Sequence, residues 1–286
     1  MNAKNTIFHQ KSTVNLRSTL INFSIPKVMG ILNLTPDSFY DGGRNNEILH
    51  ALKHTEKMLD EGAEIIDIGA YSSRPNAENI SIETEQTRLI PVIKQLVKQF
   101  PQAIFSIDTF RHKVAEAAID QGAHIINDIS GGEMDSKMFS TVARLRVPYI
   151  LMHMRGNPQT MNNLTHYEDV FKDVYKYFSV KISQLKEKGV YDIILDPGFG
   201  FAKNTEQSYD LLSKLDQFRM LGLPVLAGIS RKSMIYKFLG TDVNDALNGT
   251  SIANTIALLN GASILRVHDV KQAVEAIKIV EKIKSF

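Results

Sequence analysis

Short apolar runs of this sequence end repeatedly in a polar or ionisable residue. These residues are Asn33, Asp67, Asp108, Asn127, His153, Asp196, Ser230 with Lys232, and Arg266 with His268. Carboxylates and amides suit the edge of a heterocycle rich in N–H donors, whereas Arg266, His268 and Lys232 suit an anion. Unpaired buried charges are costly, which disfavours a packing role for the whole set. The pattern predicts a site for a polar aromatic heterocycle that carries a phosphate-type group.

Structural hydrogen bonding is the alternative for these residues. A ring of such bonds is easier to accept for Asp67 or His153 alone than for the whole set. For Arg266, the alternative is an ion pair with Asp269 or another acid that turns it away from the site.

The sequence has no motif for covalent or hydrolytic catalysis. The patterns G-x-S-x-G, G-x-x-x-x-G-K and H-E-x-x-H do not occur. Cysteine is absent, which excludes disulfides, thiolate nucleophiles and zinc sites that use Cys. His50 and His54 have the spacing of metal ligands on one helix face, but a solvent-exposed face is the favoured interpretation.

Glycines mark the points where helical stretches give way to the apolar runs. They occur in Glu61-Gly62, Gln121-Gly122, Lys188-Gly189, Leu221-Gly222 and Asn260-Gly261, and glycine suits the left-handed conformation just past a helix end. The runs are nearly continuous in Ile, Val and Leu, as is typical of parallel strands covered on both faces. They predict strands over Lys27–Leu32, Glu64–Ile68, Ala103–Ile107, His124–Ile129, Pro148–Met152, Asp192–Leu195, Pro224–Ile229 and Ser263–Val267.

Amphipathic segments alternate with these strands. They predict helices over Glu47–Asp60, Ile82–Gln99, Arg111–Gln121, Lys137–Arg146, Tyr167–Lys188, Thr205–Leu221, Asn244–Leu259 and Val270–Lys284. Eight alternations in about 260 residues match a single (β/α)₈ barrel, in which the C-terminal strand ends surround one site. A doubly wound open sheet is the alternative, but Lys203 stands where the third glycine of a dinucleotide-binding loop would belong.

Composition limits the partners of the protein. The 286 residues are 22% charged with a net charge of +2, so no overall positive charge attracts nucleic acid or a membrane surface. We predict an N-terminal extension over residues 1–25, with a hairpin-like piece at Thr19–Ser24, and one barrel domain over residues 26–286. The absence of cysteine fits a reducing compartment, and we expect the cytoplasm.

The segments around the polar strand ends resemble the successive signatures of dihydropteroate synthases. They are Met29–Arg44 (MGILNLTPDSFYDGGR), Ser106–Thr109 (SIDT), His124–Gly132 (HIINDISGG), Leu195–Lys203 (LDPGFGFAK), Gly228–Ile235 (GISRKSMI) and Arg266–Asp269 (RVHD). The resemblance runs from about residue 26 to the C-terminus, with the motifs in the right order and at the right spacing. It implies a (β/α)₈ barrel, small-molecule substrates, Mg²⁺ as cofactor and a homodimer.

The resemblance also implies a role for each site residue. The pterin would be held by Asp108, Asn127, Asp196 and Lys232, of which Asp108, Asp196 and Lys232 are the expected catalytic residues. Asn33 would ligate Mg²⁺, and Arg266 with His268 would bind pyrophosphate. Para-aminobenzoate would be bound by Ser73, Arg74, Phe201 and Ser233. The implied reaction joins this amine to a dihydropterin pyrophosphate.

This chain departs from the family pattern in the loop after the second strand. Tyr71 replaces an acid, Ser73 replaces a threonine and Asn76 replaces a glycine, which leaves sulfonamide sensitivity open. Two other functions remain as alternatives. One is a methyltransferase that uses a reduced folate and a corrinoid partner, although the RVHD and SSRP segments are not expected there. The other is a catalytically silent pterin-binding paralogue.

Overall fold

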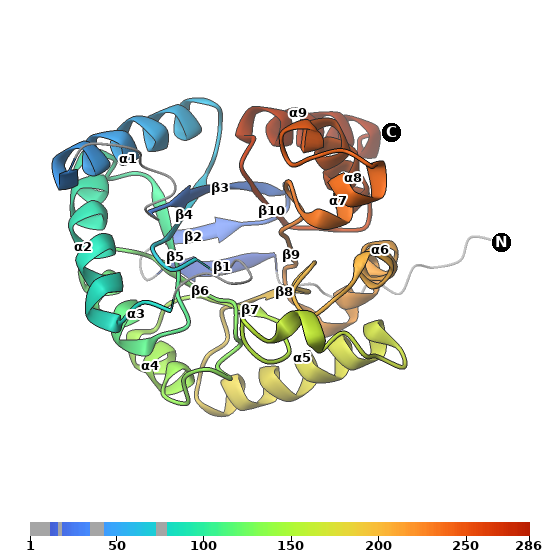
Figure 1. Cartoon of the computed structure of the whole chain (residues 1–286), viewed down its shortest axis with the longest axis horizontal. Helices are drawn as coiled ribbons and strands as arrows, with labels where there is room; N and C mark the ends of the chain where they lie inside the picture. Colours follow the sequence, from blue (N-terminus) through green and yellow to red (C-terminus); the bar gives the residue numbers. More distant parts are fainter. Residues whose placement is uncertain (1–11, 17–18, 35–42, 73–78) are drawn as a thin grey trace.

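The chain forms a closed barrel of parallel strands surrounded by helices (Figure 1). The structure is a computed structural model and describes residues 12–16, 19–34, 43–72 and 79–286. The barrel strands are β3 (Lys27–Asn33), β4 (Ile65–Gly69), β5 (Ile104–Asp108), β6 (Ile125–Asp128), β7 (Tyr149–Met152), β8 (Ile193–Asp196), β9 (Leu226–Ala227) and β10 (Ile264–Val267). The helices are α1 (Gly43–Asp60), α2 (Ile82–Gln99), α3 (His112–Asp120), α4 (Met138–Leu145), α5 (Val170–Glu187), α6 (Thr205–Ser213), α7 (Ser233–Leu239), α8 (Leu247–Leu259) and α9 (Val270–Lys284).

The sheet closes on itself and confirms the predicted (β/α)₈ barrel. Its strands lie in the order β8-β7-β6-β5-β4-β3-β10-β9, and a parallel bridge between Leu195 and Val225 joins the two outer strands. The alternative of an open doubly wound sheet is therefore wrong. Gly69 pairs with both Asn33 and Asp108, and Asp108 pairs with Asn127. This register brings the polar C-terminal strand ends to one level, and we call this end of the barrel the mouth.

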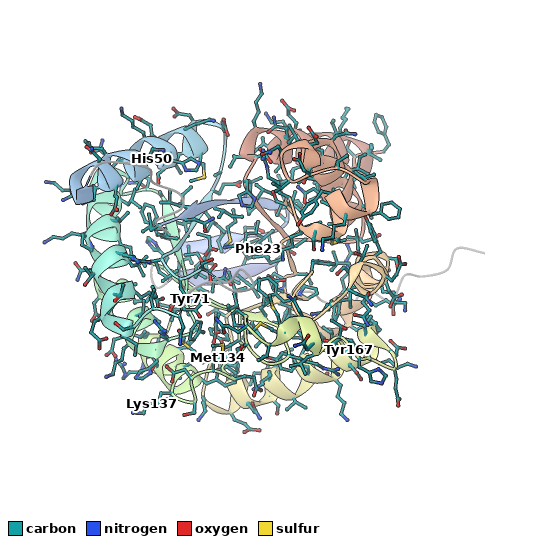
Figure 2. The ribbon with its side chains drawn as sticks, in the orientation of Figure 1. Phe23, His50, Tyr71, Met134, Lys137 and Tyr167 are labelled. Carbon is teal, nitrogen blue, oxygen red and sulfur yellow. The ribbon has the colours of Figure 1, made fainter. Side chains whose placement is uncertain are left out.

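A two-stranded hairpin closes the opposite end of the barrel. It consists of β1 (Thr13–Leu16) and β2 (Thr19–Asn22), so the hairpin begins earlier than the piece predicted at Thr19–Ser24. Its apolar residues pack on the innermost strand residues, and Phe23 lies close to the centre of the ring (Figure 2). The buried members of this cluster are Val14, Leu16, Ile21, Phe23, Met29, Ile65, Ile125, Ile150, Ile194, Leu226 and Ile264.

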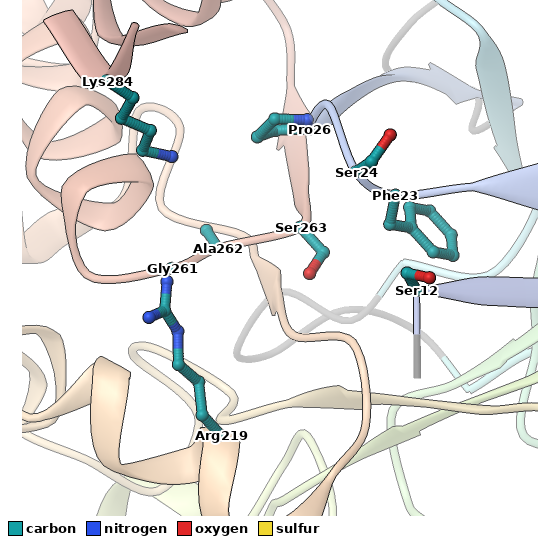
Figure 3. Close-up of a pocket in the computed structure, with 9 residues that line it drawn as sticks. All are labelled: Ser12, Phe23, Ser24, Pro26, Arg219, Gly261, Ala262, Ser263 and Lys284. Carbon is teal, nitrogen blue, oxygen red and sulfur yellow. The ribbon is translucent and has the colours of Figure 1, made fainter. Parts of the chain in front are cut away.

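A cavity of about 230 Å³ lies at the hairpin end (Figure 3). It is bordered by residues that flank the hairpin, by the residues just before β3 and β10, and by the side chains of Arg219 and Lys284. The polar strand ends lie at the mouth, so this cavity takes no part in the site that they form.

The helices follow the predicted order, with three departures. The segment Thr205–Leu221 divides into α6 and the 3-10 helix η3 (Leu215–Leu221), the segment Asn244–Leu259 divides into the 3-10 helix η4 (Asn244–Ala246) and α8, and α7 was not predicted at all. Asn204 and Gln207 form a capping box at α6, and the hydroxyl of Ser81 caps α2. In the part of the chain that the structure describes, no helix is long and apolar enough to cross a membrane.

Candidate active site

Arg266 on β10 crosslinks three strands at the mouth. Its Nε donates to Oδ2 of Asp67 at 2.7 Å, and its Nη2 donates to Oδ2 of Asp108 at 2.8 Å. The side chain of Asp67 is fully buried, while those of Arg266 and Asp108 are 20% and 17% exposed. Burial disfavours the guanidinium charge, but the two carboxylates outweigh it and hold the pKa of Arg266 above its ordinary value. Arg266 is therefore a permanent cation that joins β10 to β4 and β5.

Asp269, the alternative ion-pair partner considered for Arg266, binds another arginine. Asp269 accepts two hydrogen bonds from Arg231, at 2.9 Å from Nε and 2.7 Å from Nη2. Arg266 does pair with acids, but they lie inside the mouth. Its Nη1 has no hydrogen-bond partner among the described residues, so Nη1 is the atom left for an anion. The binding of pyrophosphate by Arg266 stays a prediction.

Two strand ends complete the polar group around Arg266. Nδ2 of Asn127 donates to Oδ2 of Asp67 at 2.9 Å, and Oδ1 of Asp67 is buried without a partner in the described chain. Burial raises the pKa of Asp108 to about 7. The positive charge of Arg266 lowers this pKa in part, and the nearby carboxylate of Asp67 raises it. Protonated Asp108 can donate a hydrogen bond, and ionised Asp108 can stabilise a cationic ring.

The raised pKa of Asp108 predicts how stability varies with pH. The folded protein holds a proton that the unfolded chain releases above about pH 4. The contribution of Asp108 to the free energy of unfolding therefore falls as pH rises from about 4 to about 7, and is constant above that. Asp108→Asn should remove this slope, whereas Asp120→Asn at the exposed end of α3 should retain it. Urea unfolding between about pH 4.5 and pH 8 measures the slope; equal slopes in wild type and Asp108→Asn would contradict the prediction.

Asp196 and Lys232 form the facing side of the mouth. Oδ1 of Asp196 accepts from the backbone N–H of Gly198 at 2.8 Å, and Nζ of Lys232 donates to the carbonyl of Phe199 at 2.6 Å. Nζ also lies 4.7 Å from the ring centroid of Phe201. Burial raises the pKa of Asp196, and burial lowers that of Lys232 to about 8. Burial is thus the main cause of both pKa shifts, and shifted pKa values of this kind are typical of functional sites.

His268 and Asn33 lie at the outer edge of the mouth. Nδ1 of His268 lies 3.1 Å from the hydroxyl of Ser230, and the side chains of His268 and Asn33 are exposed. No group of three or more His, Cys, Asp or Glu residues in the described chain could hold a metal ion. The exposed carboxamide of Asn33 is nevertheless a hard oxygen ligand, and Mg²⁺ is commonly held by one or two protein oxygens plus substrate phosphates. These residues fit a Mg²⁺ ion that arrives with a phosphorylated substrate.

Sequence reasoning missed the apolar wall of the mouth. A buried cluster of apolar side chains lies beside the polar groups, and it contains Tyr71, Phe110, Ile129, Met152, Met154, Met161 and Ala202, with Phe201 packed against it. Such a wall suits the face of a flat heterocycle, whose edge would meet the carboxylates. Ile129 and Met152 are the last residues of two predicted strands, so their positions contained the signal.

Lys203 is a second residue that was missed. Its Nζ lies 2.9 Å from Nδ1 of His153 and donates to the carbonyl oxygens of His153, Gly198 and Phe201. The signal was its position at the end of the LDPGFGFAK segment. This lysine connects the end of β7 to the loop that carries the partners of Asp196 and Lys232.

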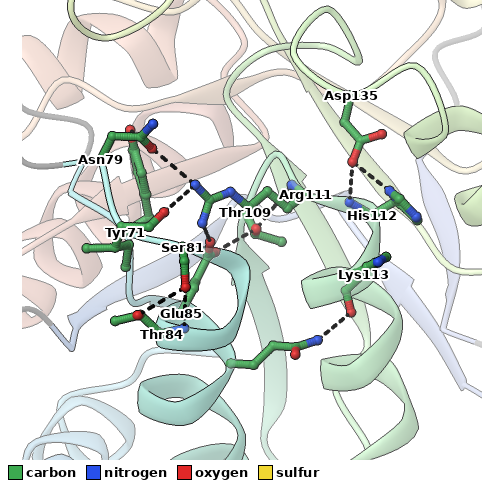
Figure 4. A network of polar contacts seen from close by, with 12 residues as sticks. Tyr71, Asn79, Ser81, Thr84, Glu85, Thr109, Arg111, His112, Lys113 and Asp135 are labelled. Atoms are coloured by element: carbon green, nitrogen blue, oxygen red, sulfur yellow. Dashed lines mark hydrogen bonds and ion pairs between the residues drawn. The ribbon is translucent and has the colours of Figure 1, made fainter.

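Tyr71, which departs from the family pattern, belongs to a network around Arg111 (Figure 4). The ring of Tyr71 meets that of Phe110 edge to face at 5.0 Å, and the guanidinium of Arg111 lies 5.2 Å from its centroid. Nη1 of Arg111 donates to buried Glu85 at 2.8 Å, and Nη2 donates to the carbonyl of Ile80 at 2.6 Å. The expected amine-binding residues Ser73 and Arg74 lie outside the described residues, whereas Ser233 begins α7 and is partly buried.

Known proteins are similar to this chain over nearly its whole length. The pterin binding enzyme family matches residues 29–268. The dihydropteroate synthase of Escherichia coli K12 is 43% identical over 267 residues, which cover 93% of this chain and 94% of that protein.

Solved structures agree with this similarity. A Yersinia pestis dihydropteroate synthase in complex with a sulfonamide drug has a TM-score of 0.90 at 39% identity, with 96% of this chain and 100% of that one covered. The dihydropteroate synthase of Xanthomonas albilineans in complex with 7,8-dihydropteroate has a TM-score of 0.86 at 35% identity, over 96% and 99% of the two chains.

Proposed function

The chain belongs to the dihydropteroate synthases of the pterin binding enzyme family, and from this membership we propose how its own residues carry out the reaction. The reaction condenses 6-hydroxymethyl-7,8-dihydropterin pyrophosphate with para-aminobenzoate to give 7,8-dihydropteroate and pyrophosphate, in folate biosynthesis. The observation that carries the residue assignment is the mouth itself, where Asp108, Asn127, Asp196 and Lys232 converge beside Arg266. The proposed compartment is the cytoplasm, which the absence of cysteine supports.

Turnover of the purified protein tests the activity directly. The protein is incubated with dihydropterin pyrophosphate, para-aminobenzoate and Mg²⁺, and dihydropteroate and pyrophosphate are measured. Release of both products in equal amounts is the expected result. Binding of a pterin without any product would instead support the catalytically silent paralogue. The corrinoid methyltransferase alternative has no support, because the similar proteins named above are dihydropteroate synthases.

The heterocycle is proposed to bind between the polar groups and the apolar wall. Its N–H donors would meet the carboxylates of Asp108 and Asp196, and Asn127 would supply an amide at the same edge. Nζ of Lys232 would meet an acceptor of the ring. As pyrophosphate leaves, positive charge develops on the exocyclic carbon and spreads into the ring. The buried carboxylates stabilise that charge, because they act at low dielectric and need no reorientation.

The leaving pyrophosphate is proposed to bind at the outer edge of the mouth. Nη1 of Arg266 and the imidazole of His268 are the donors that this edge offers, and Asn33 is the proposed Mg²⁺ ligand. Mg²⁺ would supply charge neutralisation of the departing pyrophosphate oxygens. Because Nε and Nη2 of Arg266 are held by Asp67 and Asp108, the guanidinium is fixed in position before any anion arrives.

An anion bound without substrate is the expected sign of this arrangement. Crystals grown from sulfate should show a tetrahedral anion within hydrogen-bond distance of Nη1 of Arg266 and of His268, with Asn33 nearby. Crystals of His268→Ala grown in parallel should show it weakened or lost. Wild-type crystals at molar sulfate without density at this place would contradict the pyrophosphate assignment.

The second substrate is proposed to enter beside Phe201 and Ser233. Phe201 lies on the connection after β8, which also carries the Lys232 partner Phe199, and Ser233 directly follows Lys232 at the start of α7. Ser73 and Arg74 are proposed to close the other side. A neutral aromatic amine is already a nucleophile, so its orientation towards the exocyclic carbon matters more than a general base. No residue is therefore assigned as base.

A homodimer is proposed, and it is supported by exposed apolar side chains on neighbouring helices. On α8, Ile252, Ile256 and Leu259 are 55%, 40% and 52% exposed and form one stripe at helical spacing. Phe238 and Leu239 at the end of α7 are 64% and 51% exposed. Contiguous apolar surface of this kind marks a protein interface. A second copy of the chain is the proposed occupant, as the family resemblance implies.

A charge placed in this stripe should separate the subunits. Ile252→Glu is expected to convert the dimer into a monomer, because a carboxylate would be buried without a partner at each interface. Val180→Glu on α5, where Val180 is 49% exposed, is the matched control and should leave the mass unchanged. Light scattering on a sizing column measures the mass. Equal masses for wild type and Ile252→Glu would exclude α8 from the interface.

A further inference from the structure

Lys203 is a buried amine without a carboxylate in ion-pair contact. Its residue is 6% exposed, and no acid in the described chain lies within ion-pair distance of its Nζ. Four acceptors surround that atom. They are Nδ1 of His153 at 2.9 Å and the carbonyl oxygens of His153 at 3.2 Å, Gly198 at 3.0 Å and Phe201 at 3.0 Å. Lys203 thus ties the connection after β8 to the end of β7.

Packing alone does not account for a lysine at this position. Burial lowers the pKa of Lys203 well below its ordinary value, and it does the same to His153. A methionine of similar length would fill the space without removing a charged group from water. What the amine supplies, and a thioether does not, is several hydrogen bonds that converge on two separate segments.

The segment that Lys203 holds needs outside support. Gly198, Gly200 and Ala202 all have positive φ, at +69°, +76° and +49°, so no regular secondary structure fixes the backbone here. A β-carbon on Gly198 would lie 2.1 Å from the carbonyl oxygen of His153, which shows how closely the two segments approach. Ala202 in the left-handed region is a strained conformation that its surroundings must maintain.

The same segment makes the contacts that orient the two main charged groups of the mouth. The N–H of Gly198 donates to Asp196 at 2.8 Å, the carbonyl of Phe199 accepts from Lys232 at 2.6 Å, and the ring of Phe201 lies 4.7 Å from Nζ of Lys232. Lys203 donates to the carbonyls of Gly198 and Phe201, that is, of the first and last of these three residues. Fixing those two residues fixes the contacts between them.

We propose that Lys203 is a positioning residue for the pterin: by tying Gly198 and Phe201 to His153, it holds the partners of Asp196 and Lys232 in place. This inference rests on the proposed function, in which Asp196 and Lys232 bind the heterocycle. Lys203 itself touches neither substrate. Its removal should therefore weaken pterin binding more than it weakens the fold or the binding of the amine.

Lys203→Met tests this inference, with Lys214→Met as the matched control. Lys214 lies at the end of the neighbouring helix α6, where it pairs with Asp210 at the surface. In Lys203→Met, KM for dihydropterin pyrophosphate should rise about ten-fold or more, as for the loss of hydrogen bonds to a charged group. KM for para-aminobenzoate should rise less than that, because Phe201 is the one residue of this segment proposed to meet the amine, and Lys214→Met should resemble wild type in both.

A second variant keeps the test decisive if Lys203→Met folds poorly. Lys203→Gln retains one N–H₂ group on a shorter side chain, so its KM for the pterin should lie between those of wild type and Lys203→Met. Calorimetry with a 6-substituted pterin measures the pterin affinity of the three proteins without turnover, and the affinities should follow the same order as the KM values. Variants that melt earlier but keep the wild-type pterin KM and affinity would show a purely structural role and overturn the inference. Failure of the proposed function would appear in the wild type itself, as absence of pterin binding and of product, and would overturn the inference with it.

Discussion

Asp196→Ala is expected to lose most of its turnover while it keeps the fold of the wild type. The residue is 5% exposed, and its Oδ1 is already held by Gly198, while Oδ2 accepts no hydrogen bond from the described residues. Oδ2 is thus available to the heterocycle. Loss of a hydrogen bond to a charged group costs about 1.5–3 kcal/mol, or roughly ten- to a hundred-fold in binding. Stabilisation of the developing cation is lost in addition, so kcat should fall together with kcat/KM.

Lys232→Ala should show the same loss of pterin affinity from the facing side of the mouth. Calorimetry with a 6-substituted pterin measures the affinity, steady-state kinetics measure kcat, and thermal melting reports on the fold. Asp216→Ala, an exposed carboxylate on η3, is the control and should behave as wild type. If Asp196→Ala and Lys232→Ala both bind the pterin with wild-type affinity, neither residue holds the substrate.

The strand positions were predictable because the signal lies in consecutive residues. A parallel strand covered on both faces must be apolar throughout, and each of the eight predicted runs overlaps a strand of the structure. The start of α2 was also a local feature, since Ser81 caps it with its own hydroxyl. In contrast, α7 has only seven residues, Ser233–Leu239, which is too short for a clear helical period. The hairpin was predicted only from Thr19 onward. Its first strand, Thr13–Leu16, lies before the core residues of the barrel in the sequence.

The pairing of the site residues was not predictable in the same way. The residues of the mouth follow from the strand ends, so their identities were accessible. Which of them pair depends on the closure of the barrel, since Arg266 and Asp67 are 199 positions apart in the sequence. The acid nearest in sequence, Asp269, was the partner considered in the alternative interpretation, but it accepts from Arg231 instead. The sequence pattern therefore predicted that the charged residues lie at the C-terminal end of the barrel, but it could not predict which of them form ion pairs.

Arg266→Met is expected to destabilise the protein strongly. It leaves the fully buried Asp67 and the mostly buried Asp108 without their cation, and breaking a buried pair from one side costs about 3–5 kcal/mol. Because a fifth of the Arg266 side chain is exposed, solvent offsets part of this loss and the lower end of the range is expected. For a chain of this size the melting temperature should fall by roughly 5–15 °C. Arg144→Met, whose partner Glu116 is at the surface, should change stability by less than about 1 kcal/mol.

The loss in Arg266→Met should depend on pH and on Asp67. Without the guanidinium the carboxyl of Asp108 holds its proton more tightly when folded, which raises the pKa of Asp108 further, so the variant becomes less stable relative to wild type as pH rises from about 7 to about 9. Adding Asp67→Asn removes one unpaired charge and keeps an oxygen for Asn127, so the double variant should recover a large part of the stability. Urea unfolding at both pH values measures these differences. If Arg266→Met is as stable as Arg144→Met, the crosslink to Asp67 and Asp108 contributes little, and Arg266 is free to turn its whole guanidinium to the pyrophosphate. If it is destabilised as expected, the guanidinium stays with the carboxylates, and only Nη1 reaches the anion.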